Sequence, residues 1–382
     1  MDTRDLVPVV VDATAADPVP GLDAALTGAG PALLPVPAGV HGAQVAAHLM
    51  ASCAGVVPAD TAVVVPTSGS TGEPKGVRIG TAALEYSATA THTHLGGPGQ
   101  WLLAMSPARI AGLTVLVRCR TADVASVALD MLDGFRPDAF AAAVARMDAG
   151  TRRYSALVPT QLIRLLDAGV GLADLDAILL GGGPIPVGLP ERAAAAGARV
   201  VRTYGMTETC GGCVYDGLPL PGVRLKISED GLIHISGPVL GHGYLGPPPS
   251  GFHGAWFATS DLGHLDAAGV LHVHGRADDV IVTGGVNVAA QAVEAVLAGQ
   301  PGVAAVTVVG RPDPEWGMRV VALLVPADPA VPPDPEPLRA AVAGALGRAH
   351  VPREFRVAAG LPMLPSGKVD RVAVRRAVET SP

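Results

Sequence analysis

Lysine is scarce in this 382-residue chain, and two of its three lysines lie in segments whose residue types could do chemistry. Lys75 lies in the run Thr-Ser-Gly-Ser-Thr-Gly-Glu-Pro-Lys-Gly at residues 67–76, and Lys368 ends the run Leu-Pro-Ser-Gly-Lys. Because almost every other basic residue is arginine, a compact and rotatable ammonium at these two positions indicates phosphate or carboxylate chemistry.

Segment 67–76 combines four hydroxyls, three glycines and a lysine, so its backbone N–H groups and hydroxyls could surround a polyphosphate. It is not a Walker A loop, because Lys75 follows Pro74 and precedes Gly76. A flexible turn would leave the dense set of hydroxyls unexplained. The residues expected to bind phosphate are Thr67, Ser68, Gly69, Ser70, Thr71, Gly72 and Lys75.

Short apolar strands precede several glycine-rich or proline-rich loops, and ligands of α/β sheets bind at such strand ends. The expected strands are 62–65, 154–158, 177–180 and 199–203, and the expected helices are 81–93, 160–168 and 189–196. Their alternation predicts an α/β fold. Two hairpins are expected after residue 215, from 223–228 with 232–236 and from 262–265 with 270–273.

A separate α+β unit is expected after Gly275-Arg276. Its predicted strands are 280–283, 303–310 and 319–325, and its predicted helices are near 288–298 and 336–347. The chain should therefore have a large N-terminal domain of layered α/β sheets at 1–276 and a small α+β domain at 277–382. We place the boundary near Asp278.

Composition narrows the class of partner. The formal net charge of −7 and the pI near 5.9 disfavour an extended nucleic-acid surface, which needs clustered cations. No apolar run approaches the length of about 18 residues that a membrane-spanning helix needs, so no membrane insertion is expected. The start Met-Asp-Thr-Arg-Asp lacks the order of a signal peptide, and a cytoplasmic protein is expected. Small molecules are the expected partners.

The four cysteines are few for this length, which suits a reducing compartment. Cys210 and Cys213 have the spacing of a redox or zinc pair. A structural zinc ion would need two further ligands, and no second pair follows nearby. Two ordinary thiols in a glycine-rich turn are therefore expected, and no role is assigned to them.

Five motifs in order carry a family resemblance. They are the segment 67–76, Tyr-Gly-Met-Thr-Glu-Thr at 204–209, Ser260-Asp261, Gly-Arg-Ala-Asp-Asp at 275–279, and Pro-Ser-Gly-Lys at 365–368. Together they closely resemble the acyl-adenylate-forming superfamily of acyl-CoA synthetases, adenylation domains and luciferases. The resemblance covers residues from about Val63 to Arg371. One departure is that the usual Thr-Gly-Asp reads Thr-Ser-Asp at 259–261, which keeps the carboxylate.

The resemblance implies a site for ATP and Mg²⁺. Segment 67–75 would hold the β and γ phosphates, Thr207 would contact the α phosphate, and Glu208 would bind Mg²⁺, a cation that prefers carboxylate oxygens. Asp261 would accept from the ribose hydroxyls, assisted by Arg276. The residues that would frame the adenine are Gly181, Gly182, Gly183 and Tyr204.

The resemblance also implies that the C-terminal domain is mobile, with Asp278 as its hinge. Lys368 would be catalytic, because an ammonium stabilises the charge that grows when a carboxylate attacks the α phosphorus. A second orientation of the domain would present the face around Gly284 and Gly285 to CoA. A surface lysine in a C-terminal loop is the plain alternative for Lys368.

The acid to be activated is suggested by a narrower resemblance. The short stretch before the phosphate loop and the run 208–217 resemble o-succinylbenzoate–CoA ligases of menaquinone biosynthesis, of the short actinobacterial type. Their substrate is a dianion, and the carboxylate that is not adenylated must meet a cation or water. Arg109 and Arg118 lie in an apolar run, so either could bind it, or one or both could extend to the surface.

Other functions stay open from the sequence. The chain could be a CoA ligase for another aryl or medium-chain acid, or an adenylating enzyme that loads a carrier protein. A non-catalytic adenylate-binding protein is disfavoured by the presence of Lys75, Glu208, Asp261 and Lys368. His92 and His94 receive no role, because neighbours two apart point to different faces of a helix. A homo-oligomer is possible.

Overall fold

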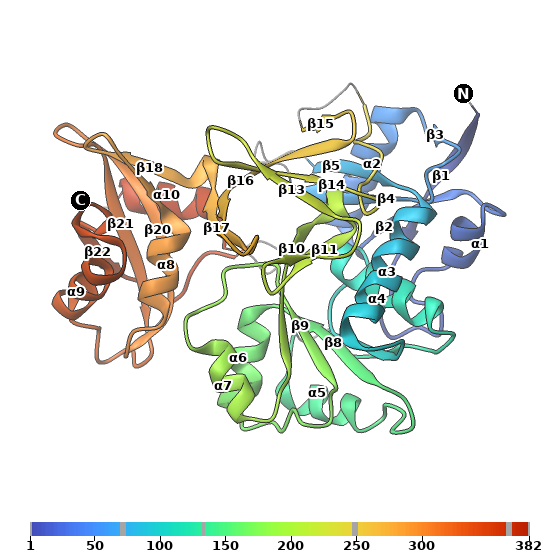
Figure 1. The fold of residues 1–382 in the computed structure, drawn as a ribbon, viewed down its shortest axis with the longest axis horizontal. Coiled ribbons are helices and arrows are strands. Elements are labelled where there is room, and N and C mark those ends of the chain that lie inside the picture. Colours follow the sequence, from blue (N-terminus) through green and yellow to red (C-terminus); the bar gives the residue numbers. More distant parts are fainter. Residues whose placement is uncertain (1, 69–73, 132–133, 247–250, 364–368, 381–382) are drawn as a thin grey trace. The chain divides into compact units, whose positions relative to one another are not determined.

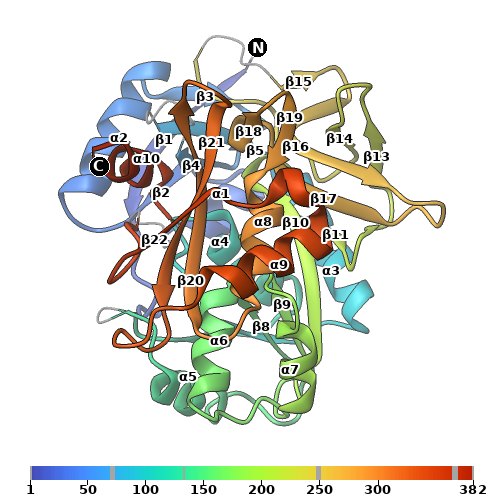
Figure 2. The ribbon, with the colours of Figure 1, turned by 90° about the vertical axis from the view of Figure 1, so that its left-hand side faces the viewer.

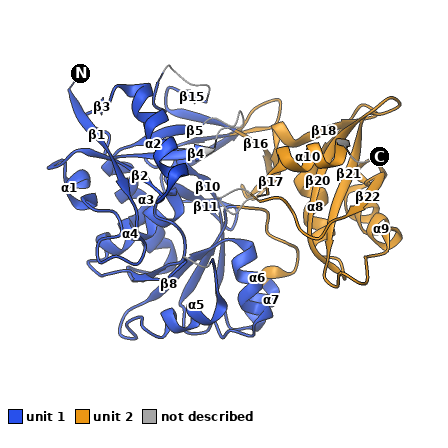
Figure 3. Ribbon diagram, turned by 180° about the vertical axis from the view of Figure 1, so that it is seen from behind, with its two compact units in different colours: residues 1–182, 191–226, 234–259 blue, residues 183–190, 227–233, 260–382 orange. Residues whose placement is uncertain are grey.

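The computed structural model describes residues 2–68, 74–131, 134–246, 251–363 and 369–380 (Figure 1). Contacts divide the chain into two compact units (Figure 3). Unit 1 consists of residues 1–182, 191–226 and 234–259, and unit 2 consists of residues 183–190, 227–233 and 260–382. No helix in the described ranges has the length and apolar character needed to cross a membrane.

The first sheet of unit 1 has the strand order β3-β1-β2-β4-β5. Its strands are β1 (Thr3–Val10), β2 (Ala32–Val36), β3 (Val56–Pro58), β4 (Val63–Ser68) and β5 (Pro74–Ile79), with helices α1 (Leu22–Thr27) and α2 (Val40–Cys53). In β4 three consecutive valines are buried, which is typical of a strand covered on both faces. The sheet therefore fixes the strand that leads into the predicted phosphate segment.

The second sheet of unit 1 has the order β12-β11-β10-β9-β8-β6-β7. Its strands are β6 (Gln100–Leu103), β7 (Val127–Ala128), β8 (Arg153–Leu157), β9 (Ala177–Leu180), β10 (Val200–Met206), β11 (Gly211–Tyr215) and β12 (Leu218–Pro219). The helices are α3 (Thr81–Leu95), α4 (Ile110–Thr121), α5 (Pro137–Val144), α6 (Pro159–Asp167) and α7 (Leu189–Ala195). The pairs β6–β8, β8–β9 and β9–β10 are parallel, so the predicted α/β alternation is confirmed.

A third sheet has the order β13-β14-β16-β15, and β17 pairs with β16. These strands are β13 (Arg224–Ile227), β14 (Leu232–Ser236), β15 (Phe252–His253), β16 (Trp256–Leu265) and β17 (Leu271–Arg276). Both predicted hairpins are present in it. The long β16–β17 hairpin places Asp261 opposite Arg276, at the end of the hairpin away from its turn.

The sheet of unit 2 has the order β19-β18-β21-β20, with β22 paired to β21. Its elements are β18 (Val280–Thr283), β19 (Val286–Ala289), α8 (Ala290–Ala298), β20 (Val303–Asp313), β21 (Gly317–Pro326), α9 (Pro335–Leu346), β22 (Glu354–Val357) and α10 (Arg371–Thr380). Alternate residues of β20 and β21 face opposite sides. One side packs against α8 and α9, and the other packs against α10 (Figure 2).

The division into units differs from the predicted boundary. The last segment of unit 2 begins at Ser260, within β16, and so includes the part of β16 that pairs with β17 from Asp261 to Arg276. The sequence placed this hairpin in the N-terminal domain and the boundary near Asp278. The hinge at Asp278 stays a prediction.

Candidate active site

The predicted phosphate segment joins two antiparallel strands. β4 leads into residues 69–73 and β5 leads out of them, and Thr67 lies directly opposite Lys75. The Thr67 hydroxyl donates to the Lys75 carbonyl at 3.4 Å. The register of β4 with β5 therefore holds these two residues together at the base of the segment. Gly69, Ser70, Thr71 and Gly72 lie outside the described residues, and of Ser68 only the backbone is described.

Glu208 lies in the short 3₁₀ helix η1 (Thr207–Thr209), which directly follows β10. Its carboxylate is buried, and Oε1 accepts a hydrogen bond of 2.6 Å from the Tyr244 hydroxyl. A charged acceptor makes this hydrogen bond stronger than a neutral one. Thr207, in the same turn, is half-buried. The bond therefore fixes the side chain that was predicted to bind Mg²⁺.

Tyr244 links this carboxylate to the phosphate segment. It forms an isolated bridge with Val77 of β5, and the Lys75 ammonium lies 5.8 Å from the centroid of its ring. That position is within the range of a cation–π contact. The structure thus brings Lys75 and Glu208 together around Tyr244. Sequence reasoning missed this residue, although a lone tyrosine in the glycine-rich run Gly-His-Gly-Tyr-Leu-Gly at 241–246 was a usable signal.

The predicted adenine loop begins where β9 ends. A side chain at Gly181 would approach to 2.3 Å of the Thr203 hydroxyl oxygen, so the backbone comes too close here for any other residue. Gly182 has a φ of 79°, a conformation that glycine adopts without strain. Tyr204 is half-buried in β10, and Gly183 completes the loop. Close approach therefore requires glycine at position 181, and the positive φ favours glycine at position 182.

In unit 2 Arg276 lies between two predicted site residues. One of its terminal nitrogens, Nη2, lies 2.9 Å from Oδ2 of Asp278, and Nη1 lies 3.9 Å from Oδ1 of Asp261. The second contact follows from the cross-strand pairing of β16 and β17. The structure thus joins the predicted ribose carboxylate to the predicted hinge through one arginine.

Arg118, which lies on α4, and Arg109, which precedes this helix, occupy different environments. The Arg118 side chain is only 3% exposed, and its guanidinium carbon lies 4.7 Å from the centroid of the Trp101 ring. Its Nε has no hydrogen-bond partner, and no carboxylate within the described ranges pairs with it. The alternative that Arg118 extends to the surface is therefore excluded. Arg109 precedes α4, is half-buried, and donates to the Pro66 carbonyl at 3.4 Å.

His92 belongs to the surroundings of Arg118. Burial lowers its pKa to about 4, and the nearby charge of Arg118 adds to this effect. The ring is therefore neutral near pH 7, and its Nε2 accepts from the indole nitrogen of Trp101 at 3.2 Å. Arg118 then supplies the positive charge in this group, because arginine stays protonated even when burial lowers its pKa.

Gly284 and Gly285 form the two-residue turn between β18 and β19. Their φ angles are 55° and 79°, the positive values that such a hairpin turn requires at both positions. A side chain at Gly284 would approach to 2.8 Å of the Trp316 ring, so the turn packs closely on that residue. Lys368 lies outside the described residues.

Cys210 and Cys213 are both buried and unpaired. Burial raises the pKa of each thiol, to about 12 for Cys213. A thiol that stays protonated is a poor nucleophile and a poor metal ligand. Across the described ranges no group of three or more histidine, cysteine or acidic side chains could hold a metal ion.

Two family models match different parts of the chain, one in the N-terminal part and one in the C-terminal part. The model of the AMP-binding enzyme family matches residues 12–245, and that of the AMP-binding enzyme C-terminal domain matches residues 292–368. Both the observed division at Ser260 and the predicted boundary near Asp278 lie between these matches.

Individual relatives agree with the family match. A probable 2-succinylbenzoate–CoA ligase of Mycobacterium tuberculosis is 47% identical over 365 residues, which cover 94% of both chains. The structure of o-succinylbenzoate CoA synthetase from Bacillus subtilis with the acyl-adenylate intermediate OSB-AMP has a TM-score of 0.74 and 29% identity, covering 86% of this chain and 71% of that one. The same enzyme with ATP and magnesium ion has a TM-score of 0.72 and 30% identity, covering 83% and 70%.

Proposed function

Because the chain belongs to the AMP-binding enzyme family, we propose that it is an AMP-forming acid–CoA ligase whose substrate is 2-succinylbenzoate. The reaction has two steps. The aryl acid attacks the α phosphorus of ATP and releases diphosphate, and CoA then displaces AMP from the acyl-adenylate to give 2-succinylbenzoyl-CoA. The relative with 47% identity across 94% of both chains supports this choice of activity.

One structural observation carries the choice of a dianionic acid. Arg118 is a buried cation with an aromatic ring on one side and no carboxylate partner within the described ranges. An unpaired buried charge is costly, so a fold that keeps one has a use for it. The second carboxylate of the acid would supply the missing anion. Arg109 lies next to Pro66 at the base of the phosphate segment, which favours a role nearer the nucleotide.

The residues around Tyr244 fit a nucleotide with its metal ion. Glu208 offers a buried carboxylate oxygen, and Mg²⁺ is commonly held by one or two carboxylates together with substrate phosphates. When bound, the ion would neutralise phosphate charge. Lys75 would bind the terminal phosphates, Thr207 the α phosphate, and the loop at Gly181 with Tyr204 the adenine. Asp261 and Arg276 would bind the ribose, and Gly284 with Gly285 would meet CoA.

The activity is tested by diphosphate release with MgATP across a panel of acids. We expect release to depend on 2-succinylbenzoate and to be followed by formation of a CoA thioester and AMP. ADP and phosphate as products would refute an adenylation mechanism. Preference for another acid, transfer to a carrier protein in place of CoA, or nucleotide binding without turnover would each identify one of the alternative functions.

Changing Tyr244 to phenylalanine should lower kcat/KM for MgATP by about tenfold. The change removes one hydrogen bond to a charged group, and such a bond is worth about 1.5–3 kcal/mol. The ring that Lys75 faces is kept, so the effect isolates the hydroxyl. Steady-state kinetics at varied MgATP measure it. A matched control is Tyr86→Phe, whose hydroxyl bonds the Pro221 carbonyl and should leave the MgATP dependence unchanged.

A further inference from the structure

Helix α10 begins at Arg371, three residues after the predicted catalytic lysine, and this arginine is tied to three other elements of unit 2. Nη2 binds both carboxylate oxygens of Glu294 on α8, at 2.8 and 2.7 Å. Nε lies 3.3 Å from Oδ2 of Asp279, and Nη1 donates to the Val308 carbonyl at 3.0 Å. One guanidinium therefore fixes the first turn of α10 in three directions.

The partners of Arg371 are buried and held in place themselves. The side chains of Glu294 and Asp279 are 9% and 10% exposed. Glu294 also accepts from the Thr307 hydroxyl at 3.0 Å and from the Val308 backbone at 2.7 Å. These bonds leave the carboxylate with one orientation. The three nitrogens of the guanidinium reach Glu294, Asp279 and the Val308 carbonyl at the same time, which the single ammonium of a lysine could not reproduce.

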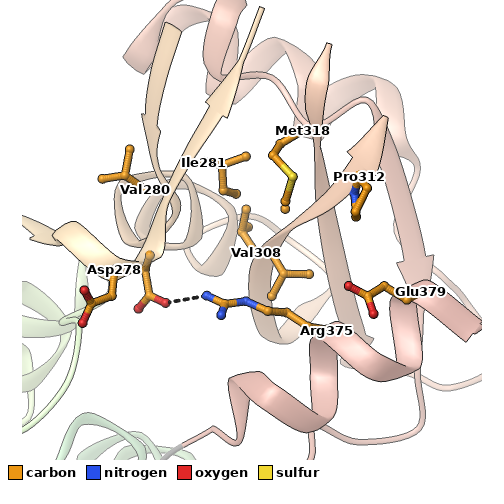
Figure 4. A pocket seen from close by; sticks show the side chains of 11 residues that line it. Asp278, Val280, Ile281, Val308, Pro312, Met318, Arg375 and Glu379 are labelled. Carbon is orange, nitrogen blue, oxygen red and sulfur yellow. Dashed lines mark hydrogen bonds and ion pairs between the residues drawn. The ribbon is translucent and has the colours of Figure 1, made fainter. Parts of the chain in front are cut away.

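Asp279 connects this network to the predicted hinge. It directly follows Asp278, in the 3₁₀ helix η2 (Ala277–Asp279), and its second oxygen Oδ1 lies 3.1 Å from Nη2 of Arg375. The Asp279–Arg375 pair borders a pocket whose apolar wall includes Ile281, Val308 and Met318 (Figure 4). Helix α10 is thus bound to the residue next to the hinge by two arginines.

The chain on either side of residues 364–368 is also fixed. Met363 pairs with Val369 as an isolated bridge, and the backbone N–H of Asp370 donates to the Pro362 carbonyl at 2.8 Å. Val369 packs against the apolar cluster between α10 and the sheet. The Asp370 carboxylate accepts from the Ala373 backbone at 3.0 Å, which caps the start of α10.

We propose that Arg371 is a positioning residue for adenylation, which holds the flank of the lysine segment through Glu294 and Asp279 and so sets where Lys368 acts. The expected effect of Arg371 on adenylation rests on the proposed function. Stability alone does not explain the arrangement, because buried ion pairs contribute little to it compared with apolar packing. Placement does matter to rate, since an error of about 1 Å in a reacting group can cost about a hundredfold.

The test compares Arg371→Gln with Arg375→Gln, a change of the same type one turn later on α10. Arg375 shares Asp279 but is 43% exposed, and its other contacts do not include Glu294. Arg371→Gln should lower kcat of diphosphate release by at least about tenfold, and Arg375→Gln by less than about threefold. KM for ATP and thioester formation from a supplied acyl-adenylate should change little in both variants. Arg371→Lys should not restore the rate.

A double variant separates positioning from folding. Arg371→Gln leaves Glu294 buried without its cation, so the melting temperature should fall. Adding Glu294→Gln removes that charge, and the melting temperature should recover while adenylation stays slow. Recovery of both the melting temperature and the adenylation rate in the double variant would show that Arg371 acts only on stability. A normal adenylation rate in Arg371→Gln would overturn the proposal.

Hydrogen exchange gives a readout that does not depend on activity. In Arg371→Gln the amides of Asp370 and Val374, which are bonded in the structure, should exchange faster than in Arg375→Gln. Unchanged exchange at both amides would contradict the proposed fixing of this flank. If exchange accelerates as expected but the unaltered protein adenylates no acid, the proposed function fails and the structural part of the inference stands.

Discussion

Replacement of Lys368 by alanine should slow adenylation by about 10²–10³-fold while sparing the second half-reaction. When the carboxylate attacks the α phosphorus, negative charge grows on the transferring group. A placed ammonium binds that charge more tightly in the transition state than in the ground state, so its loss raises the barrier of this step. Thioester formation from a supplied acyl-adenylate needs no such charge at the α phosphorus.

Single-turnover measurements of the two half-reactions test this expectation. The chain offers a matched control in Lys226→Ala, since Lys226 is the third lysine, is exposed on β13, and lies 4.5 Å from the Trp256 ring centroid. That change should leave both half-reactions intact. Equal damage to the two half-reactions in Lys368→Ala would indicate a folding defect and would remove the case for catalysis.

The strands that carry the site were predictable because each is a short apolar run followed by glycine or proline. β8, β9 and β10 lie within a residue or a few of their predicted ranges for this reason. β5 was not predicted, because Pro74 and Gly76 at its start are typical of a loop. Its pairing with β4 sets Thr67 opposite Lys75, and such a register depends on contacts that a local pattern does not contain.

The first 60 residues show the limit of periodicity as a signal. They form β1, α1, β2, α2 and β3, although no helix or strand was predicted among them. In β1 only Leu6 is buried, so the alternation of a half-buried strand is absent. Helix α2 begins after Gly39 without a side-chain cap and buries small residues such as Gly42 and Ala46. The sheet, rather than local preference, organises these residues.

The site residues also divide into those that the sequence could identify and those that required the structure. Those in contiguous motifs, such as Glu208 and Asp261, could be found from their order along the chain. The contacts of Tyr244 and Arg371 could not be predicted, because they involve residues 36 and 77 positions away in the chain. The burial of Arg118 also required the structure, since an arginine in an apolar run can equally extend to the surface.

Replacement of Arg118 by leucine should raise KM for 2-succinylbenzoate by about tenfold to a hundredfold, because a hydrogen bond to a charged group is worth about 1.5–3 kcal/mol. KM for ATP should be nearly unchanged. A benzoate analogue without the second carboxylate should lose the same energy in the unaltered enzyme and lose little more in the variant. Steady-state kinetics with both acids, in both proteins, measure this coupling.

The environment of Arg118 allows a loss of substrate binding to be distinguished from a loss of stability. No carboxylate in the described part of the chain pairs with it, so its removal leaves no orphaned partner, and the melting temperature should not fall as it does when a buried pair is broken. Arg120→Leu, two positions later on α4, is the control, because Arg120 pairs with Asp23 and Glu85 and should not affect the acid. Arg109→Leu tests the other candidate. If Arg118→Leu and Arg109→Leu both bind the dianion normally, neither arginine binds the second carboxylate. The choice of acid then rests on similarity to relatives alone.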